Sequence, residues 1–302
     1  MENIEDILFK SRELFFHFVD ECNNRYRNEK DLEYYRNIIE IHRRLNNIED
    51  ILKSEGFLDL LRNTLVEWDM NKRAAELQEI DIIKKNILSH ESILKELYKY
   101  KLHEIFSLAD EEGKIILSKL NFIFKHLNIS KTKRQLVSAS KTLHFLLPDL
   151  VLPMDGRYTM SFYRYSNIPE NLDGQFNIFK DVFIKSHHIT KKLILSTNDL
   201  DNVMWNTSVP KLIDDAIIGF SKEFEEFVDN DNDRGIINFL DSLSKYTKFS
   251  SYYLRDYLEE RRDKFVNSER QKIKKRIIII KAKEAGITVS DEEIDNYLKN
   301  KQ

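Results

Sequence analysis

Apolar residues recur every three or four positions along most of this chain, which is the spacing that gathers them on one face of an α-helix. The first two sets are Ile4, Ile7, Leu8, Phe15, Phe18 and Val19, and then Tyr35, Ile38, Ile39, His42, Leu45 and Leu52. The second of these helices is expected to end at Gly56, because glycine favours helix ends. No stretch alternates apolar and polar residues with period two, so no strand is predicted. The pattern predicts an all-α protein with a multi-helix globular body.

Four prolines mark the part of the chain where helices are interrupted. All of them lie between residues 148 and 210. Proline breaks a helix interior because it lacks an amide hydrogen and clashes with the preceding turn. Long helices are therefore permitted before and after this region. Upstream, the periodicity predicts helices over about 57–68, 74–89, 91–107 and 113–127.

Polar residues that accept hydrogen bonds from free amides indicate where further helices begin. Ser130 is the expected N-cap of a helix that continues to the first proline. Asp155 is the expected N-cap of a short helix through Tyr163. Ser208, with Pro210 in the first turn, is expected to start a long amphipathic helix.

An acidic run at 229–233, Asp-Asn-Asp-Asn-Asp, is the predicted linker between two domains. The expected organisation is a helical body at 1–229, with a sub-boundary considered near 110–130, and a helical C-terminal extension at 234–302. Near the end of the extension, Ser290 and Glu293 have the spacing of a capping box.

Composition narrows the class of protein. The chain has 302 residues and a formal net charge of −3, so no whole-molecule field favours a nucleic acid or a membrane. The single cysteine, Cys22, excludes an internal disulfide and cysteine-based metal centres. No apolar run reaches the roughly 18 residues of a membrane-spanning helix, and the N-terminus lacks a signal-peptide pattern. We therefore expect a cytoplasmic protein with no membrane partner.

The positions of the glycines argue against a nucleotide cofactor. The seven glycines are too widely spaced to form a phosphate-binding loop or a dinucleotide fingerprint. No cofactor and no metal are expected.

One long window departs from the balanced charge of the rest. Between Gly113 and Pro148 there is no Asp or Glu. Seven basic residues lie there: Lys114, Lys119, Lys125, Lys131, Lys133, Arg134 and Lys141. A local basic surface is what phosphate contacts require. We expect DNA or RNA to bind through this 113–148 stretch. The residues predicted to contact nucleic acid are Lys131, Lys133, Arg134, His144 and Arg157.

The segment at 137–163 resembles the catalytic core of helix-hairpin-helix DNA glycosylases. In that family a lysine at the start of a helix and an aspartate after a Pro-x-Asp turn face one pocket. The matching residues here are Lys141 and Asp155, the second within Pro153-Met154-Asp155. Ser138-Ala139-Ser140 stands where the family has a Gly-x-Gly hairpin. The resemblance implies a helical fold that acts on nucleic acid.

The roles of the two residues follow from the same resemblance. Lys141 would be the catalytic nucleophile that attacks the sugar carbon and forms a Schiff base. Asp155 would support the positive charge that develops on the sugar.

Two other interpretations stay open. Asp155 can serve only as a helix cap, and Lys141 only as a surface lysine. The long proline-free amphipathic helices also fit a non-catalytic interaction module, which buries apolar faces against a protein partner or in a homo-oligomer.

Overall fold

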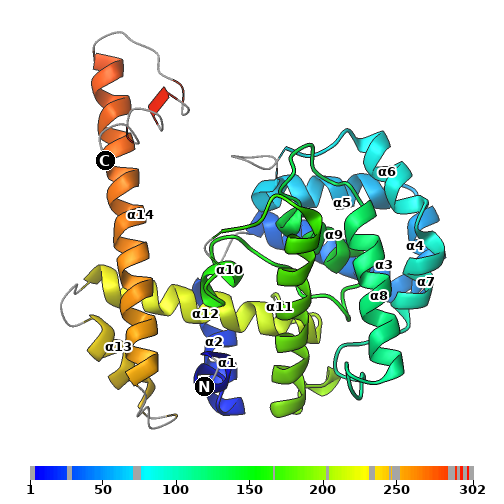
Figure 1. Ribbon diagram of the computed structural model, residues 1–302, viewed down its shortest axis with the longest axis horizontal. Helices are drawn as coiled ribbons and strands as arrows, with labels where there is room; N and C mark the ends of the chain where they lie inside the picture. Colours follow the sequence, from blue (N-terminus) through cyan, green and yellow to red (C-terminus); the bar gives the residue numbers. More distant parts are fainter. Residues whose placement is uncertain are drawn as a thin grey trace. The chain divides into compact units, whose positions relative to one another are not determined.

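The computed structural model describes residues 4–25, 29–70, 76–165, 167–201, 204–230, 235–244, 246, 252–284, 290, 293–294 and 298 (Figure 1). Over this part of the chain every regular element is a helix, and one isolated antiparallel bridge joins Leu77 to Ser130. The all-α prediction is confirmed. The chain divides into two compact units, Met1–Glu223 and Phe224–Gln302.

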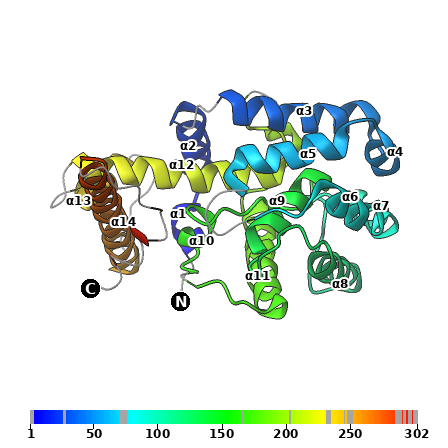
Figure 2. The ribbon, with the colours of Figure 1, turned by 90° about the horizontal axis from the view of Figure 1, so that it is seen from above.

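The first unit contains most of the helices. In chain order they are α1 (Ile4–Leu8), α2 (Arg12–Arg25), α3 (Glu29–Leu45), α4 (Ile48–Lys53), α5 (Phe57–Leu65), η1 (Val66–Met70), α6 (Ile80–Leu88), α7 (Glu91–Tyr98), α8 (Glu111–His126), α9 (Leu136–Leu146), α10 (Thr159–Phe162), α11 (Leu172–Lys192), η2 (Thr197–Asp199) and the greater part of α12 (Val209–Asn230). Helices α3 and α5 lie side by side (Figure 2).

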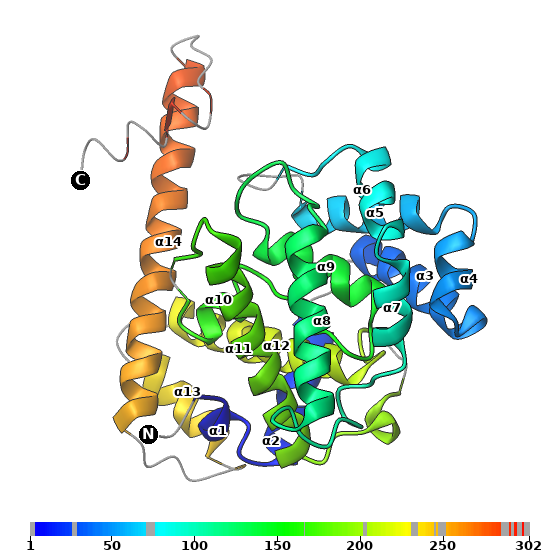
Figure 3. The same cartoon turned by 45° about the vertical axis from the view of Figure 1, so that its right-hand side comes forward.

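Helix α9 is the most enclosed element of this unit. Ten of its eleven residues are buried, although its sequence, LVSASKTLHFL, includes several polar side chains. Helices α5, α8 and α11 pack against it (Figure 3). Because α9 is surrounded in this way, its polar side chains must find partners inside the protein.

Several of the predicted helix boundaries were wrong, each because of an interaction that the periodicity does not reveal. The predicted helix through residues 35–52 is broken after Leu45. Asn46 adopts a φ of 47°, and the Asn47 side chain caps a new helix by accepting from the amide of Glu49. Asparagine tolerates the left-handed region better than most residues, so the break falls there.

The predicted helices over 74–89 and 91–107 are shorter in the structure, at Ile80–Leu88 and Glu91–Tyr98. Before the first, Leu77 pairs with Ser130 in the antiparallel bridge. After the second, the amide of Leu102 donates to the carbonyl of Asp149, 2.8 Å away. Long-range backbone pairing therefore replaces the helix ends.

Ser130 is not the N-cap of α9. Its hydroxyl donates to the carbonyl of Glu76 at 2.9 Å, and α9 begins at Leu136. The free amides of Gln135 and Leu136 instead donate to the side-chain oxygen of Gln175, in α11, at 2.7 and 2.9 Å. A residue 40 positions away in sequence thus caps the central helix.

Helix α12 begins as predicted. The Ser208 hydroxyl oxygen accepts a hydrogen bond from the amide of Lys211 at 3.3 Å, which is the N-cap interaction. Further along α12, Gly219 lies against α2, where a side chain would collide with the backbone at Phe18. This close approach fixes α12 against α2.

The second unit contains the end of α12 together with α13 (Gly235–Leu243) and α14 (Tyr252–Glu284). The ring of Phe239 packs edge-on against Phe224 and Phe227, with centroids 5.3 and 5.7 Å apart. The predicted capping box is confirmed: the amide of Glu293 donates to Ser290 Oγ, and the amide of Ser290 donates to the Glu293 carboxylate.

The predicted linker at 229–233 extends past Asn230 into residues that lie outside the described part of the chain. None of the described helices combines the length and apolar character that crossing a bilayer requires.

Candidate functional site

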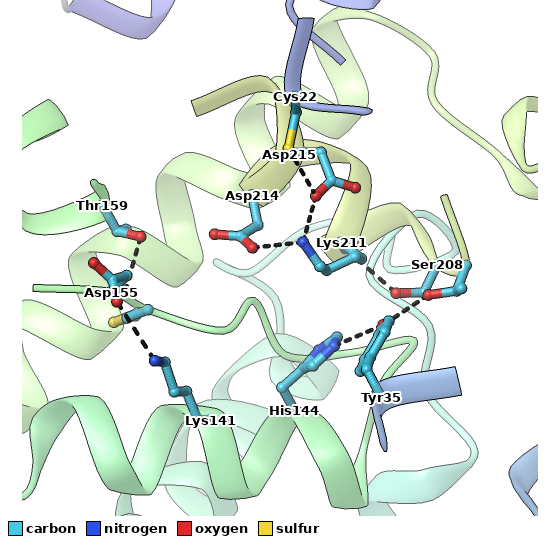
Figure 4. A network of polar contacts seen from close by, with 12 residues as sticks. Cys22, Tyr35, Lys141, His144, Asp155, Thr159, Ser208, Lys211, Asp214 and Asp215 are labelled. Carbon is cyan, nitrogen blue, oxygen red and sulfur yellow. Dashed lines mark hydrogen bonds and ion pairs between the residues drawn. The ribbon is translucent and has the colours of Figure 1, made fainter. Parts of the chain in front are cut away.

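Helix α9 and the loop that follows it bring Lys141 and Asp155 together. Lys141 Nζ lies 3.4 Å from Asp155 Oδ2 (Figure 4). The Lys141 side chain is 6% exposed and the Asp155 side chain is 31% exposed. The aspartate therefore reaches solvent while the lysine lies behind it. The interpretation of Lys141 as a surface lysine was wrong.

Hydrogen bonds hold the Asp155 loop against α9. The amide of Met154 donates to Ser140 Oγ at 3.2 Å, and the amide of Asp155 donates to Thr159 Oγ1 at 3.0 Å. Thr159 is fully buried. Ser140, in the segment where the glycosylase family has its hairpin glycines, thus serves to anchor this loop.

The carboxylate of Asp155 also organises the turn that follows it. Its Oδ1 accepts from the amides of Arg157 and Tyr158, at 2.7 and 3.2 Å. Helix α10 begins one residue later, at Thr159. Asp155 therefore accepts from amides in the turn before α10, but it is not the N-cap of that helix, which is Tyr158, so the predicted capping role was wrong.

The surroundings of Asp155 favour its ionised form. Burial by itself would raise the pKa of Asp155, but the Lys141 charge and the amides of Arg157 and Tyr158 outweigh it and hold the pKa below its ordinary value. Asp155 is consequently a carboxylate at neutral pH.

Lys141 has further contacts with Trp68, at the kinked end of α5. Lys141 Nζ donates to the Trp68 carbonyl oxygen at 3.2 Å and lies 5.4 Å from the centroid of the indole ring. Trp68 lies inside η1, where the helix departs from regular geometry, and Asp69 beside it has a φ of 62°. This departure frees the carbonyl that Lys141 uses.

A second charged cluster lies on α12 and was not anticipated from the sequence. Lys211 Nζ lies 2.8 Å from Asp214 Oδ2 and also forms an ion pair with Asp215. All three side chains are at most 6% exposed. The thiol of Cys22 donates to Asp215 Oδ1 at 3.6 Å. Like Lys141, Lys211 lies over a tryptophan, 5.0 Å from the ring centroid of Trp205.

The protonation of this cluster follows from its burial. Burial raises the pKa of Asp215 to about 6, although Lys211 opposes the change. Burial also raises the pKa of Asp214, again against the Lys211 charge. Burial disfavours the charged form of Lys211, but the two carboxylates raise its pKa well above the ordinary value. The cluster holds a permanent ammonium group and takes up a proton in mildly acidic solution.

Asp214 faces both lysine–carboxylate groups. In Figure 4 its carboxylate lies between Lys211 and the Asp155 loop. Asp155 raises the pKa of Asp214 and Lys141 lowers it, which places the two charged groups within electrostatic reach of each other. The two clusters interact electrostatically and belong to a polar network within the core.

His144, predicted to contact phosphate, lies in the interior of this network. It is completely buried; its Nδ1 is 2.7 Å from the Val151 carbonyl oxygen and its Nε2 is 3.0 Å from the Tyr35 hydroxyl. Tyr35 in turn bonds to Thr207 Oγ1 at 2.6 Å. Burial lowers the pKa of His144 to about 3, so the ring is neutral. A buried imidazole with both nitrogens occupied cannot contact a phosphate in this conformation.

Four lysines of the acid-free window are paired with acids from distant parts of the chain. Lys131 lies 2.9 Å from Glu76 and 3.1 Å from Glu79, and Lys133 lies 3.6 Å from Glu170. Two further ion pairs, Lys119–Glu96 and Lys125–Asp173, complete this pattern. The window itself contains no acidic residue, but in the folded chain acids from other segments lie next to these lysines.

The two predicted arginines are exposed. Arg134 lies in the loop before α9, and Arg157 lies two residues after Asp155. The guanidinium carbon of Arg157 is 5.5 Å from the ring centroid of Tyr158. Of the basic residues predicted to contact nucleic acid, Arg157 is the one next to the Lys141–Asp155 pair in sequence.

Comparison with known proteins adds no family: no family model, curated protein or solved structure matches this chain.

Proposed function

We propose that this chain binds nucleic acid and that Lys141 and Asp155 are its reactive centre. One observation carries the proposal: the two residues singled out by the glycosylase resemblance lie 3.4 Å apart, with the lysine buried and the aspartate reaching solvent. Buried lysines are uncommon, and a buried lysine beside a carboxylate that reaches solvent is a candidate for a reactive site.

The chemistry assigned to each residue follows from its surroundings. Asp155 is ionised, so it can stabilise positive charge on a sugar. Lys141 would attack the sugar carbon as a neutral amine. The bond from that carbon to the base breaks, and the departing base takes up the proton that the lysine nitrogen releases, so Asp155 stays ionised. Because Lys141 lies behind Asp155, the loop that carries Asp155 must move before a sugar can reach the lysine.

Phosphate contacts are assigned to the exposed basic residues Arg157, Lys131, Lys133 and Arg134. The Lys131 and Lys133 ion pairs join exposed partners. Such pairs contribute about 0–1 kcal/mol each, so a polyanion can displace the carboxylates.

The binding test compares two substitutions that change charge equally. The Arg157→Glu variant reverses a charge beside Asp155, whereas Arg44→Glu reverses an exposed charge at the end of α3. Fluorescence anisotropy would follow binding of DNA and RNA oligonucleotides at about 50 and about 200 mM salt. We expect salt-sensitive binding that Arg157→Glu weakens on the order of tenfold and Arg44→Glu leaves nearly unchanged. Absence of binding by the wild type, or equal loss in both variants, contradicts the proposal.

A second candidate is a helical protein-interaction module. Phe106 is 85% exposed and Ile194 is 80% exposed, more than any other large apolar side chain among the described residues. A replacement of both by serine should abolish association with a protein partner, without affecting oligonucleotide binding, if this function is correct.

A further inference from the structure

Two histidines on the surface of the first unit lie next to each other, away from the polar network in the core. His90 stands between α6 and α7, and His126 is the last residue of α8. Their ring centroids are 6.1 Å apart. The exposed ring of Phe122 stacks on His126 with a centroid distance of 4.3 Å. These residues belong neither to the basic window's ion pairs nor to the Lys141 site.

Hydrogen bonds orient both imidazoles in the same way. His90 Nδ1 lies 2.6 Å from the Asn86 carbonyl oxygen, and His126 Nδ1 lies 2.7 Å from the Phe122 carbonyl oxygen. Ser89 Oγ, 3.0 Å from His90 Nδ1, donates to the same Asn86 carbonyl. A carbonyl only accepts, so each Nδ1 carries the hydrogen, and Nε2 is the nitrogen through which a neutral ring would bind a metal. Hydrogen-bonded imidazoles of this kind are the usual zinc ligands.

The spacing is close to what a shared metal requires. With Zn–N bonds of about 2.0 Å and tetrahedral angles, two imidazole centroids lie roughly 5 Å apart. The observed 6.1 Å is wider than this, so a bound metal would have to draw the two rings closer together. Soft or borderline divalent metals such as Zn²⁺, Ni²⁺ and Cu²⁺ prefer imidazole nitrogen, whereas Mg²⁺ and Ca²⁺ prefer oxygen.

One chain supplies only part of a zinc coordination shell. Structural zinc takes four protein ligands, and the described residues contain no group of three or more His, Cys, Asp or Glu side chains that could hold a metal. The site is therefore incomplete unless another molecule contributes. A twofold pairing brings the same surface of both copies together, so it would present four imidazoles to one metal.

The surrounding surface is suited to such a pairing. Phe122 is 46% exposed and Ile115, two helical turns earlier on α8, is 40% exposed. Leu88, at the end of α6, is 43% exposed. Apolar side chains beside the two histidines would lose water when a second copy covers them.

We propose that His90 and His126 form half of a zinc site and that a second copy of this chain supplies the other half. The inference is independent of the proposed action on nucleic acid. In this proposal the Nε2 atoms of His90 and His126 bind the metal, and the surface around them is the contact between the two copies.

The test measures molar mass and bound metal together. The full-length protein, stripped with a chelator, would be titrated with Zn²⁺ and followed by sedimentation velocity and metal analysis. We expect the mass to double as zinc binds, with one zinc for every two chains, and to return to that of the monomer when chelator is added. Cobalt in place of zinc should give the visible absorption of a tetrahedral site.

Substitutions locate the site. His90→Ala and His126→Ala should each abolish the zinc-dependent doubling, whereas His188→Ala, which removes an exposed histidine of α11, should leave it intact. His126 and His188 are exposed and His90 is half-buried, so circular dichroism should show that all three variants stay folded. A wild-type protein that stays monomeric with zinc, or a zinc-dependent dimer that survives in the His90→Ala/His126→Ala variant, overturns the proposal.

Discussion

Lys211 Nζ lies 2.8 Å from Asp214 Oδ2 with both side chains buried, and Lys84 Nζ lies at the same 2.8 Å from Asp59 Oδ2 with both side chains partly exposed. The two ion pairs share a distance and differ in their surroundings. Their comparison separates the effect of burial from that of geometry.

Replacement of Lys211 by methionine should destabilise the protein by about 3–5 kcal/mol, because it leaves the carboxylates of Asp214 and Asp215 buried without a counter-charge. Lys84→Met should cost less than about 1 kcal/mol, because its partner is hydrated. Urea denaturation of both variants measures the difference. Equal effects would show that the Lys211 cluster is hydrated or that its charges are absent.

The raised pKa of Asp215 makes stability depend on pH. Its pKa is about 6 in the folded protein and about 3.8 when unfolded, so the folded state binds more protons between these values. Protonation of Asp215 therefore adds to the free energy of unfolding. This contribution is complete below about pH 4 and is lost as the pH rises through about 6. Asp215→Asn should therefore give a flatter profile of unfolding free energy between about pH 4 and about pH 7 than the wild type. Parallel profiles would contradict the assignment.

Gly219 and Gly156 offer a matched test of the contact between α12 and α2. A Cβ at Gly219 would overlap the Phe18 carbonyl and lie 2.8 Å from the Cys22 amide, whereas a Cβ at Gly156 would have no atom within 4 Å. Gly219→Ala should cost about 1–3 kcal/mol or more, since backbone on both sides must shift. Gly156→Ala should be nearly neutral. Thermal unfolding of the two variants is the measurement, and a neutral Gly219→Ala would mean that the helices are further apart.

Ile194 presents a stabilising substitution. It follows α11 with a φ of 53°, and its side chain is largely exposed. The left-handed region is unfavourable for a β-branched residue by roughly 1–2 kcal/mol and is free of strain for glycine. Ile194→Gly should therefore raise the free energy of unfolding by about 1 kcal/mol. The greater conformational freedom of glycine in the unfolded chain offsets part of this gain. Ile184→Gly, within α11, should instead lower stability by about 1 kcal/mol. Two losses of similar size would show that Ile194 is not strained.

The helical class of the fold was predictable because the three-to-four-residue spacing of apolar positions marks a helix whatever that helix packs against. The positions of the helix ends were less predictable. Ser208 caps α12 within four residues and was identified, whereas α9 is capped by Gln175 from another helix. A single sequence carries local capping signals but does not reveal partners that arrive through the fold.

The same distinction between local and long-range information applies to the candidate site. Lys141 and Asp155 were identified because a local motif contains both. Lys211, Asp214 and Asp215 were not, because Lys and Asp at these spacings on a helix usually form solvent-exposed pairs. The available signal was the apolar sequence around them, Leu212–Ile213 and then Ala216–Phe220, which leaves α12 little polar surface. The ion pairs of the acid-free window could not be predicted for the complementary reason: Lys119, Lys125, Lys131 and Lys133 meet acids from distant segments of the chain.

Covalent trapping tests the role of Lys141 most directly. The protein would be incubated with an oligonucleotide that contains an abasic site, and sodium borohydride would reduce any Schiff base to a stable adduct. We predict an adduct with the wild type, a weaker one with Asp155→Asn, and none with Lys141→Gln, provided that urea denaturation shows both variants to be folded. No adduct with the wild type, or an equal adduct with Lys141→Gln, would contradict Lys141 as the reactive residue.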